Sequence, residues 1–297
     1  MPNPPTPRTS SSRHSRSTVP GGRALFEYAL LMRDQPSRTA KLDRINGLQM
    51  LVILTSSGVH AMAFECVSRT HVGLKRRVNE DSLMIRTERG LWAVADGMGG
   101  HEAGDVASSK ISDALQHLPI VYDVDELIGS AAASLQQVNH ELIQLARGDG
   151  LPRTIGSTVV ALAISGAEMR CLWAGDSRAY RWRGGKLVQL TRDHSLVQEL
   201  VNAGMLHPHE AQDHPQSNVV TRAVGVSEDL KLEVATGDAR QGDLFLLASD
   251  GLTRVVPDDD LAAELETGTL DAIADRLVEL VLQRGAPDNV SLILVRV

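Results

Sequence analysis

Aromatic residues and cysteines are scarce in this chain of 297 residues, which argues against a core built on aromatic rings and against a disulfide framework. Phe, Trp and Tyr together make up 3% of the sequence, so the hydrophobic core has to rest on Val, Leu, Ile and Ala. The two cysteines, Cys66 and Cys171, are far apart and form no Cys-x-x-Cys pair. This argues against a disulfide framework and is typical of a protein in a reducing cytoplasm.

The sequence also lacks an apolar run of the roughly 18 residues that a membrane-spanning helix needs. The run at residues 51–63 is shorter and is interrupted by Thr55, Ser56, Ser57 and His60. It also begins too far from residue 1 to match a signal peptide. With 42% hydrophobic and 23% charged residues, the composition indicates an ordinary globular protein, which we expect in the cytoplasm.

An excess of positive charge is missing as well, because the net charge is −7. Residues 1–62 hold eight Lys and Arg against three Asp and Glu, which leaves −12 for residues 63–297. Such an acidic body argues against nucleic acid as the main partner. The basic head could touch nucleic acid or anionic lipid, but a solvated tail is the favoured interpretation.

The first part of the chain carries few signs of regular structure. Residues 1–23 are rich in Ser, Pro, Thr and Arg and show no periodicity. We therefore expect residues 1–62 to be a disordered or poorly structured extension and residues 63–297 to form the folded domain. Met32, Met50 and Met62 could each be the initiator, so part of the extension is interpreted as an artefact of start-site assignment.

From residue 63 onward, apolar periodicity predicts blocks of strands and helices. The predicted strands cover residues 82–86, 91–95, 157–164, 169–174, 178–182, 186–191, 231–237, 243–248 and 289–296. The predicted helices cover residues 102–117, 124–146, 195–203, 257–265 and 269–284. Helices grouped in pairs between runs of strands favour α+β layers over alternating βαβ units.

Four aspartates stand in short turns that contain Gly or Asn: Asp96, Asp176, Asp250 and Asp288. Three of them follow strongly apolar stretches, and the fourth precedes one. Carboxylates at strand ends can be converged on one point by a rigid sheet. Two bare carboxylates 4 Å apart repel each other by about 4 kcal/mol at an effective dielectric constant of 20. Either their pKa values rise or a cation lies between them, and hard oxygen ligands favour Mg²⁺ or Mn²⁺ over Zn²⁺.

Six short motifs occur in a familiar order, although each alone is only a common turn. They are Gly73-Leu-Lys-Arg76-Arg-Val-Asn79-Glu80-Asp81, Asp96-Gly97-Met98-Gly99-Gly100, Gly156-Ser157-Thr158, Gly175-Asp176-Ser177-Arg178, Ser249-Asp250-Gly251 and Asp288-Asn289. Together they closely resemble the bacterial type 2C, metal-dependent protein serine/threonine phosphatases over about residues 65–297. The resemblance implies a four-layer αββα sandwich with two central antiparallel sheets.

The resemblance also implies roles for individual residues. Asp96 would bridge two Mn²⁺ or Mg²⁺ ions, with the Gly97 carbonyl in the second site and Asp250 and Asp288 in the first. Glycine would suit position 97 because an exposed carbonyl needs an uncrowded backbone. Asp176 would hold a third, weaker ion together with Asp250. Glu80 and Asp81 would act through metal-bound waters, and Arg76 would bind the substrate phosphate.

The mechanism implied by the resemblance is direct attack on phosphorus by a hydroxide that bridges the metals, without a phosphoenzyme. Asp96, Asp250 and Arg76 are thus the expected catalytic residues. Many eukaryotic relatives carry a His after the Asp-Gly pair as general acid, but here that place is Met98. His101 is interpreted as a residue at a helix start, so the donor of the leaving-group proton stays unassigned.

Other candidate sites have simpler interpretations. The cluster of His207, His209 and His214 matches a mobile flap of the bacterial relatives and is favoured as a surface loop. The run Asp193-His194-Ser195 is interpreted as an N-cap at Ser195, because a catalytic triad is not contiguous in sequence. The apolar stripe of residues 124–146 is assigned to the core, and Arg178 is expected to brace its turn rather than to bind substrate.

Three functions compete. The leading one removes phosphate from Ser and Thr of proteins, with a bacterial Ser/Thr kinase and its substrates as natural partners. Residues 92–108 and the architecture without an anchor also resemble phosphatases encoded with type VI secretion clusters. A catalytically inactive module that binds phosphoproteins is disfavoured because all the metal-binding aspartates are present. A hydrolase of small phosphate esters stays open, because the motifs describe only the reacting phosphate.

Overall fold

The computed structural model describes residues 41–45, 48–55, 58–99, 103–121, 123–148, 154–211 and 213–297. The chain divides into a unit of residues 1–38, outside the described residues, and a unit of residues 39–297, to which everything below refers. The expectation of disorder in residues 1–40 therefore falls outside the described part of the chain. Among the described residues, the first strand starts at Lys41, and a domain boundary near residue 63 stays a prediction.

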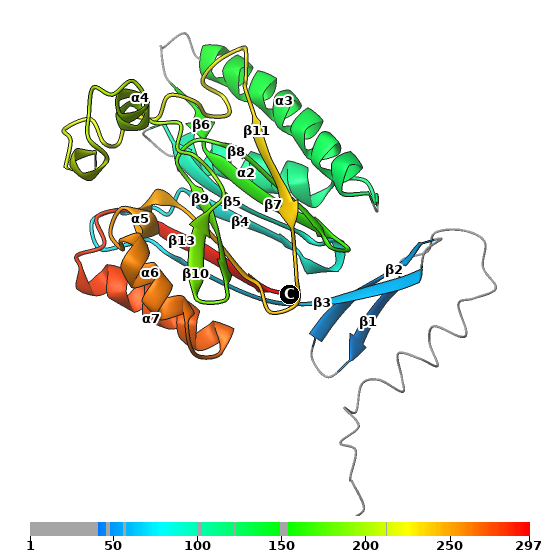
Figure 1. The fold of residues 1–297 in the computed structure, drawn as a ribbon. Coiled ribbons are helices and arrows are strands. Elements are labelled where there is room, and N and C mark those ends of the chain that lie inside the picture. Colours follow the sequence, from blue (N-terminus) through cyan, green and yellow to red (C-terminus); the bar gives the residue numbers. More distant parts are fainter. Residues whose placement is uncertain are drawn as a thin grey trace, which may run out of the picture. The chain divides into compact units, whose positions relative to one another are not determined.

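Two antiparallel sheets form the centre of the second unit (Figure 1). The seven-stranded sheet has the order β1 (Lys41–Ile45), β2 (Leu48–Thr55), β3 (Gly58–His71), β13 (Val290–Arg296), β12 (Leu244–Ala248), β9 (Arg178–Arg183) and β10 (Lys186–Gln189). The six-stranded sheet has the order β11 (Glu233–Asp238), β8 (Glu168–Ala174), β7 (Val159–Ser165), β5 (Leu91–Met98) and β4 (Asp81–Arg86), and β6 (Gly156–Ser157) pairs with β5.

Helices cover the outer face of each sheet. The six-stranded sheet packs against α2 (Ala103–Gln116) and α3 (Val124–Gly148), and the seven-stranded sheet packs against α5 (Asp250–Thr253), α6 (Asp258–Leu265) and α7 (Leu270–Gln283). The remaining described elements are α4 (Leu196–Asn202) and two 3-10 turns, η1 (Thr87–Arg89) and η2 (Pro208–Glu210). The predicted αββα sandwich is thereby confirmed.

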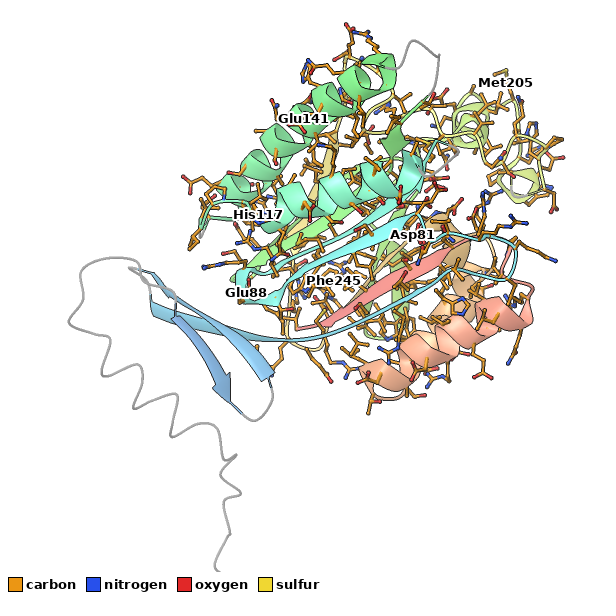
Figure 2. All side chains as sticks on the ribbon, turned by 180° about the vertical axis from the view of Figure 1, so that it is seen from behind. Asp81, Glu88, His117, Glu141, Met205 and Phe245 are labelled. Atoms are coloured by element: carbon orange, nitrogen blue, oxygen red, sulfur yellow. The ribbon has the colours of Figure 1, made fainter. Side chains whose placement is uncertain are left out.

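The central strands of both sheets are buried on both faces. In β5, Leu91 and Ala93 face the helices α2 and α3, whereas Trp92 and Val94 lie in the core between the sheets. In β12, Leu246 belongs to the cluster with α6 and α7, whereas Phe245 lies between the sheets (Figure 2). A strand with both faces buried has to be a continuous apolar run, because successive side chains point to opposite faces. This is why the sequence predicted these strands well.

Several elements of this unit were not predicted from the sequence, among them β3, α5 and β6. Strand β3 lies between β2 and β13, yet charged residues interrupt it: Glu65 pairs with Arg296 and Arg69 with Asp271 and Asp275. Helix α5 has four residues and strand β6 has two, so neither is long enough to show a period. Among the described residues, no helix is long and apolar enough to cross a membrane.

Candidate active site and metal centre

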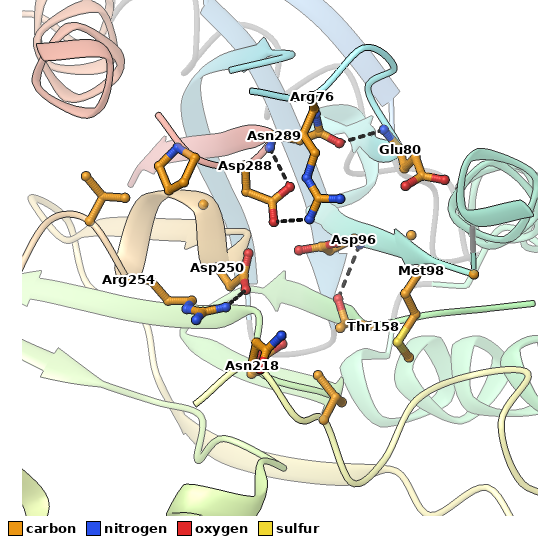
Figure 3. A pocket seen from close by; sticks show the side chains of 17 residues that line it. Arg76, Glu80, Asp96, Met98, Thr158, Asn218, Asp250, Arg254, Asp288 and Asn289 are labelled. Carbon is orange, nitrogen blue, oxygen red and sulfur yellow. Dashed lines mark hydrogen bonds and ion pairs between the residues drawn. The ribbon is translucent and has the colours of Figure 1, made fainter. Parts of the chain in front are cut away.

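Four aspartates from both sheets line one cavity of about 530 Å³: Asp96, Asp176, Asp250 and Asp288. Asp96 lies near the end of β5, Asp176 follows β8, Asp250 follows β12, and Asp288 precedes β13. Strands β5 and β8 are both antiparallel to β7, so they end on the same side of their sheet. Strand β13 is antiparallel to β12, so it begins where β12 ends. Topology therefore gathers the carboxylates, as the sequence predicted (Figure 3).

The carboxylates stand where negative charge is costly. Burial, together with the charge of Asp250, raises the pKa of Asp176 to about 8. Burial also raises the pKa of Asp96 well above its ordinary value, with added repulsion from Asp81 and Asp250. The pKa of Asp250 is raised by burial and by Asp288, and lowered in part by Arg254. A cation in this cavity would remove both the desolvation cost and the mutual repulsion.

Asp81 lies directly behind the cavity, paired with Asp96 in the register of β4 and β5. Its Oδ2 accepts a hydrogen bond of 2.9 Å from the Ser249 hydroxyl, whereas its buried Oδ1 has no partner among the described residues. Burial raises its pKa to about 7, and the charges of Asp250 and Asp288 contribute. An unpartnered carboxylate oxygen facing a cluster of acids is the kind of acceptor that a hydrated cation satisfies.

Two arginines hold carboxylates of the cavity. Arg76 Nη2 donates to Asp288 Oδ2 at 2.7 Å, and Arg254 Nη1 donates to Asp250 Oδ2 at 3.1 Å. Arg254 also donates through Nη2 to the Ser217 hydroxyl at 3.2 Å. Within the described ranges, no three His, Cys, Asp or Glu side chains already stand together as a cage of ligands. Two of the four acids, Asp288 and Asp250, are instead paired with guanidinium groups.

The Gly156-Ser157-Thr158 motif supports Asp96. Thr158 N donates to Asp96 O at 2.9 Å, and Asp96 N donates to Thr158 Oγ1 at 3.2 Å. The Ser157 hydroxyl donates to Asp96 O at 2.9 Å, and Thr158 Oγ1 lies 2.7 Å from Ser177 Oγ. The motif thus fixes the backbone that carries Asp96 and ties it to the turn that carries Asp176. The sequence showed the motif but not this role.

Asn289 clamps the loop that carries Arg76. Its side-chain Nδ2 donates to Val72 O at 2.8 Å and to Val78 O at 3.0 Å, and its Oδ1 accepts from Glu80 N at 2.8 Å. One buried amide therefore holds both ends of residues 72–80. The Asp288-Asn289 dipeptide was visible in the sequence, but its partners lie more than 200 residues away.

Gly97 is required by close packing. A Cβ at this position would lie 2.1 Å from the carbonyl oxygen of Gly104 in α2 and 2.6 Å from that of Glu80. The sequence argument gave an uncrowded carbonyl as the reason for glycine, but the structure shows that the crowded side is the one facing α2. Glu80 lines the cavity, and its Oε1 accepts from Gly104 N at 3.2 Å. Met98 also lines the cavity, whereas His101 lies outside the described residues.

The simpler interpretations of other residues agree with the structure where it describes them. Arg178 donates from Nε and Nη2 to both carboxylate oxygens of Asp193, the closest at 2.7 Å, and so braces its turn. Ser195 is the N-cap of α4 and accepts from Gln198 N at 3.3 Å. The apolar stripe of α3 lies in the core beneath the six-stranded sheet. The His207, His209 and His214 segment lies in the loop that follows α4, in and around η2.

Comparison with known sequences identifies relatives of most of the chain. The family model for protein phosphatase 2C matches residues 71–290. Serine/threonine protein phosphatase PstP of Mycobacterium tuberculosis is 36% identical over 226 residues, which are 76% of this chain and 43% of that protein. The chain therefore spans less than half the length of that relative. Serine/threonine phosphatase stp of Listeria monocytogenes is 34% identical over 235 residues, which are 76% of this chain and 93% of that protein.

Solved structures share the same fold. PppA, described as a key regulatory component of T6SS in Pseudomonas aeruginosa, has a TM-score of 0.73 and 46% identity, covering 78% of this chain and 97% of its own. The catalytic domain of PstP, solved in complex with two manganese ions, has a TM-score of 0.70 and 33% identity, with the same coverage of both chains.

Proposed function

The chain belongs to the protein phosphatase 2C family, and on this premise we propose that it is a metal-dependent phosphatase that hydrolyses phosphoserine and phosphothreonine in proteins. The observation that carries this is the convergence of four carboxylates from both sheets on one cavity, with Arg76 at its edge. A family resemblance alone supplies a fold, whereas this arrangement supplies the chemistry.

The donor set fits Mn²⁺ or Mg²⁺. Asp96, Asp250 and Asp288, with the Gly97 carbonyl, would hold two ions, and Asp176 with Asp250 would hold a third, weaker one. All of these ligands are hard oxygens, which such cations prefer over softer donors. Asp81 and Glu80 would accept hydrogen bonds from the waters of the ions, a role supported by the unpartnered Asp81 Oδ1. When bound, a pair of divalent ions supplies the Lewis acidity that activates water near neutral pH.

The protein itself positions the phosphate and balances charge. Arg76 is about half exposed at the cavity edge, so its planar guanidinium can move from Asp288 to two phosphate oxygens once cations screen Asp288. Asn289 and Thr158 hold the backbones that carry Arg76 and Asp96, so little reorganisation is needed when substrate arrives. Met98 stands where many eukaryotic relatives carry a histidine that acts as general acid, and its thioether cannot donate the leaving-group proton.

Phosphate release from a phosphothreonine peptide by the full chain tests the proposal. We expect release with Mn²⁺ and with Mg²⁺ and none with EDTA, because the carboxylates cannot activate water without a cation. Free phosphoserine, run in parallel, separates a protein phosphatase from a hydrolase of small esters. If folded protein released no phosphate with any divalent cation, the module that only binds phosphoproteins would become the better interpretation.

Asp176→Asn tests the third ion. The substitution keeps the shape of a side chain that is 7% exposed and leaves Asp96, Asp250 and Asp288 in place. We expect kcat to fall about tenfold, which is the lower end of the effect of a residue that supports a metal site without forming it. The Mn²⁺ concentration that half-saturates the main site should stay the same. Identical kinetics of variant and wild type across the whole Mn²⁺ titration would speak against a third ion.

The partners follow from the proposed activity and stay proposals. A phosphatase of this class would reverse a Ser/Thr kinase, so we infer a cognate bacterial kinase and its substrates as partners. The likeness to PppA supports a role beside a type VI secretion system. A cytoplasmic location is proposed because phosphorylated substrates of such kinases are found there, and the two described cysteines are both free.

A further inference from the structure

A second cavity of about 430 Å³ lies beside the catalytic one and has no part in the mechanism above. The two cavities share Asp176, Asp250 and Arg254 as wall residues. The rest of the second wall comes from Arg178 and Asp193, from α4 with its N-cap and the segment that follows it, and from the end of α5 with the start of α6. A peptide whose phosphate occupies the first cavity therefore passes next to the second.

A buried hydroxyl in this second cavity lacks a partner. Thr253 lines the cavity, its side chain is 6% exposed, and its Oγ1 has no hydrogen-bond partner among the described residues. Buried polar groups in folded proteins are nearly always hydrogen-bonded, because an unmade bond costs free energy. The hydroxyl of Thr253 is therefore an unsatisfied hydrogen-bonding group in the wall of this cavity.

The charged residues that line the second cavity favour a cationic ligand. Its wall holds four aspartates and two arginines. Arg178 pairs with Asp193 and Arg254 with Asp250, and the proposed third ion would take Asp176. Asp258 is left without a cationic partner in the described part of the chain. Its Oδ1 accepts from the Tyr180 hydroxyl at 3.0 Å, which orients the carboxylate and leaves Oδ2 open.

The remaining wall is apolar. Val197 and Val201 of α4, with Pro208 and Pro257, line the same cavity. A wall with an aliphatic stretch and one oriented carboxylate matches a side chain with a long methylene stem and a cationic head. Lysine and arginine have this form, and they lay their stems along apolar surface while the head reaches a polar group.

We propose that the second cavity binds a lysine or arginine side chain close to the phosphorylated residue of the substrate. The cationic head donates to Asp258 Oδ2 and to Thr253 Oγ1, and the stem packs on Val197 and Val201. This inference rests on the proposed phosphatase activity. An extended peptide advances about 3.3 Å per residue, so neighbouring cavities place this side chain within about three residues of the phosphate.

Peptide selectivity of the full chain with Mn²⁺ tests the inference. The substrates are phosphothreonine peptides with an otherwise all-Ala surround, in which a single Lys, Leu or Glu is moved through the neighbouring positions on both sides. We expect Lys to raise kcat/KM for phosphate release about tenfold over Ala at one of these positions. Leu or Glu equal to or better than Lys at every position would overturn the proposal.

Asp258→Asn identifies the partner of the lysine. We expect it to reduce the Lys-over-Ala ratio to about twofold, because the carboxylate no longer attracts the ammonium. Asp259→Asn removes the same charge one residue further along, outside the cavity lining, and should keep the ratio of the wild type. An unchanged ratio in Asp258→Asn, or an equal fall in both variants, would overturn the assignment. Failure to hydrolyse even the all-Ala peptide would instead refute the phosphatase activity itself.

Thr253→Val gives an independent readout. The substitution removes the unpartnered hydroxyl with little change of shape, so the Tm of the free protein should stay the same or rise, while the lysine preference falls about twofold or more. A hydroxyl with a merely structural role would give the opposite result, namely a lower Tm and an unchanged preference.

Discussion

Asp250→Asn is expected to reduce phosphatase turnover by at least about 1,000-fold, equivalent to about 4 kcal/mol of lost transition-state stabilisation. The carboxylate of Asp250 belongs to both the proposed two-ion centre and the proposed third site, so an amide weakens all of them at once. The measurement is kcat for a phosphothreonine peptide over a Mn²⁺ titration. Asp259→Asn, an exposed change outside both cavities, should retain the kcat of the wild type.

Stability separates a metal ligand from a residue that merely holds the fold. Burial and the charge of Asp288 raise the pKa of Asp250, so the ionised group is costly in protein without metal. In EDTA we therefore expect the Tm of the Asp250→Asn variant to match or exceed that of the wild type. Mn²⁺ should raise the Tm of the wild type, since a ligand stabilises the state that binds it, and should raise that of the variant much less. Full activity, or a Tm that collapses in EDTA, would contradict the assignment.

The carboxylates of the site could be predicted from the sequence because their signal is local. The apolar runs that become β5, β8 and β12 are each followed by an aspartate, as at Ala95-Asp96 and Ala248-Ser249-Asp250, and the run that becomes β13 is preceded by one. Because the strands are antiparallel and short, a residue next to a strand lies at one of the two ends of the sheet. Period and position together were enough to predict a cluster of acids and the cation that it needs.

The groups that position these acids could not be predicted in the same way. Thr158 contacts Asp96 across 62 residues, and the contact depends on the pairing of β6 with β5, a strand too short to detect. Arg254 meets Ser217 because the segment after α4 folds back toward α5, which no pattern in either segment indicates. Long-range contacts of this kind depend on the complete topology, whereas a strand depends only on its own residues and burial.

The physical reason for the glycine at position 97 could not be predicted from the sequence either. Gly97 was explained by its own carbonyl, but the constraint comes from Gly104 in the adjacent helix, whose carbonyl leaves no room for a Cβ. The same holds for β3, whose charged residues are neutralised by partners on α7 and β13. A sequence pattern identifies a residue, whereas its contacts with distant partners determine which side chains fit at that position.

Asn289→Asp is expected to loosen the loop that carries Arg76 and to destabilise the domain by about 3 kcal/mol. The new side chain has the same shape, but it cannot donate, so the carbonyls of Val72 and Val78 lose their partner and face a carboxylate. An unsatisfied buried carbonyl costs about 1–3 kcal/mol. Asn202→Asp is the matched control, because the exposed Asn202 side chain accepts from Gln198 and Arg192 and loses no acceptor on the change.

Urea unfolding and amide hydrogen exchange check this expectation together with kinetics. The amide of Glu80, which now donates to Asn289 Oδ1, marks the C-terminal end of the loop. We expect faster exchange over residues 72–80 and a lower kcat/KM for the phosphopeptide, because Arg76 is no longer held at the cavity edge, whereas Asn202→Asp should stay within about 0.5 kcal/mol of the wild type. Unfolding free energy and loop exchange equal to those of the control would show that the loop is held by the hydrogen bond from Leu74 N to Ala286 O and not by Asn289.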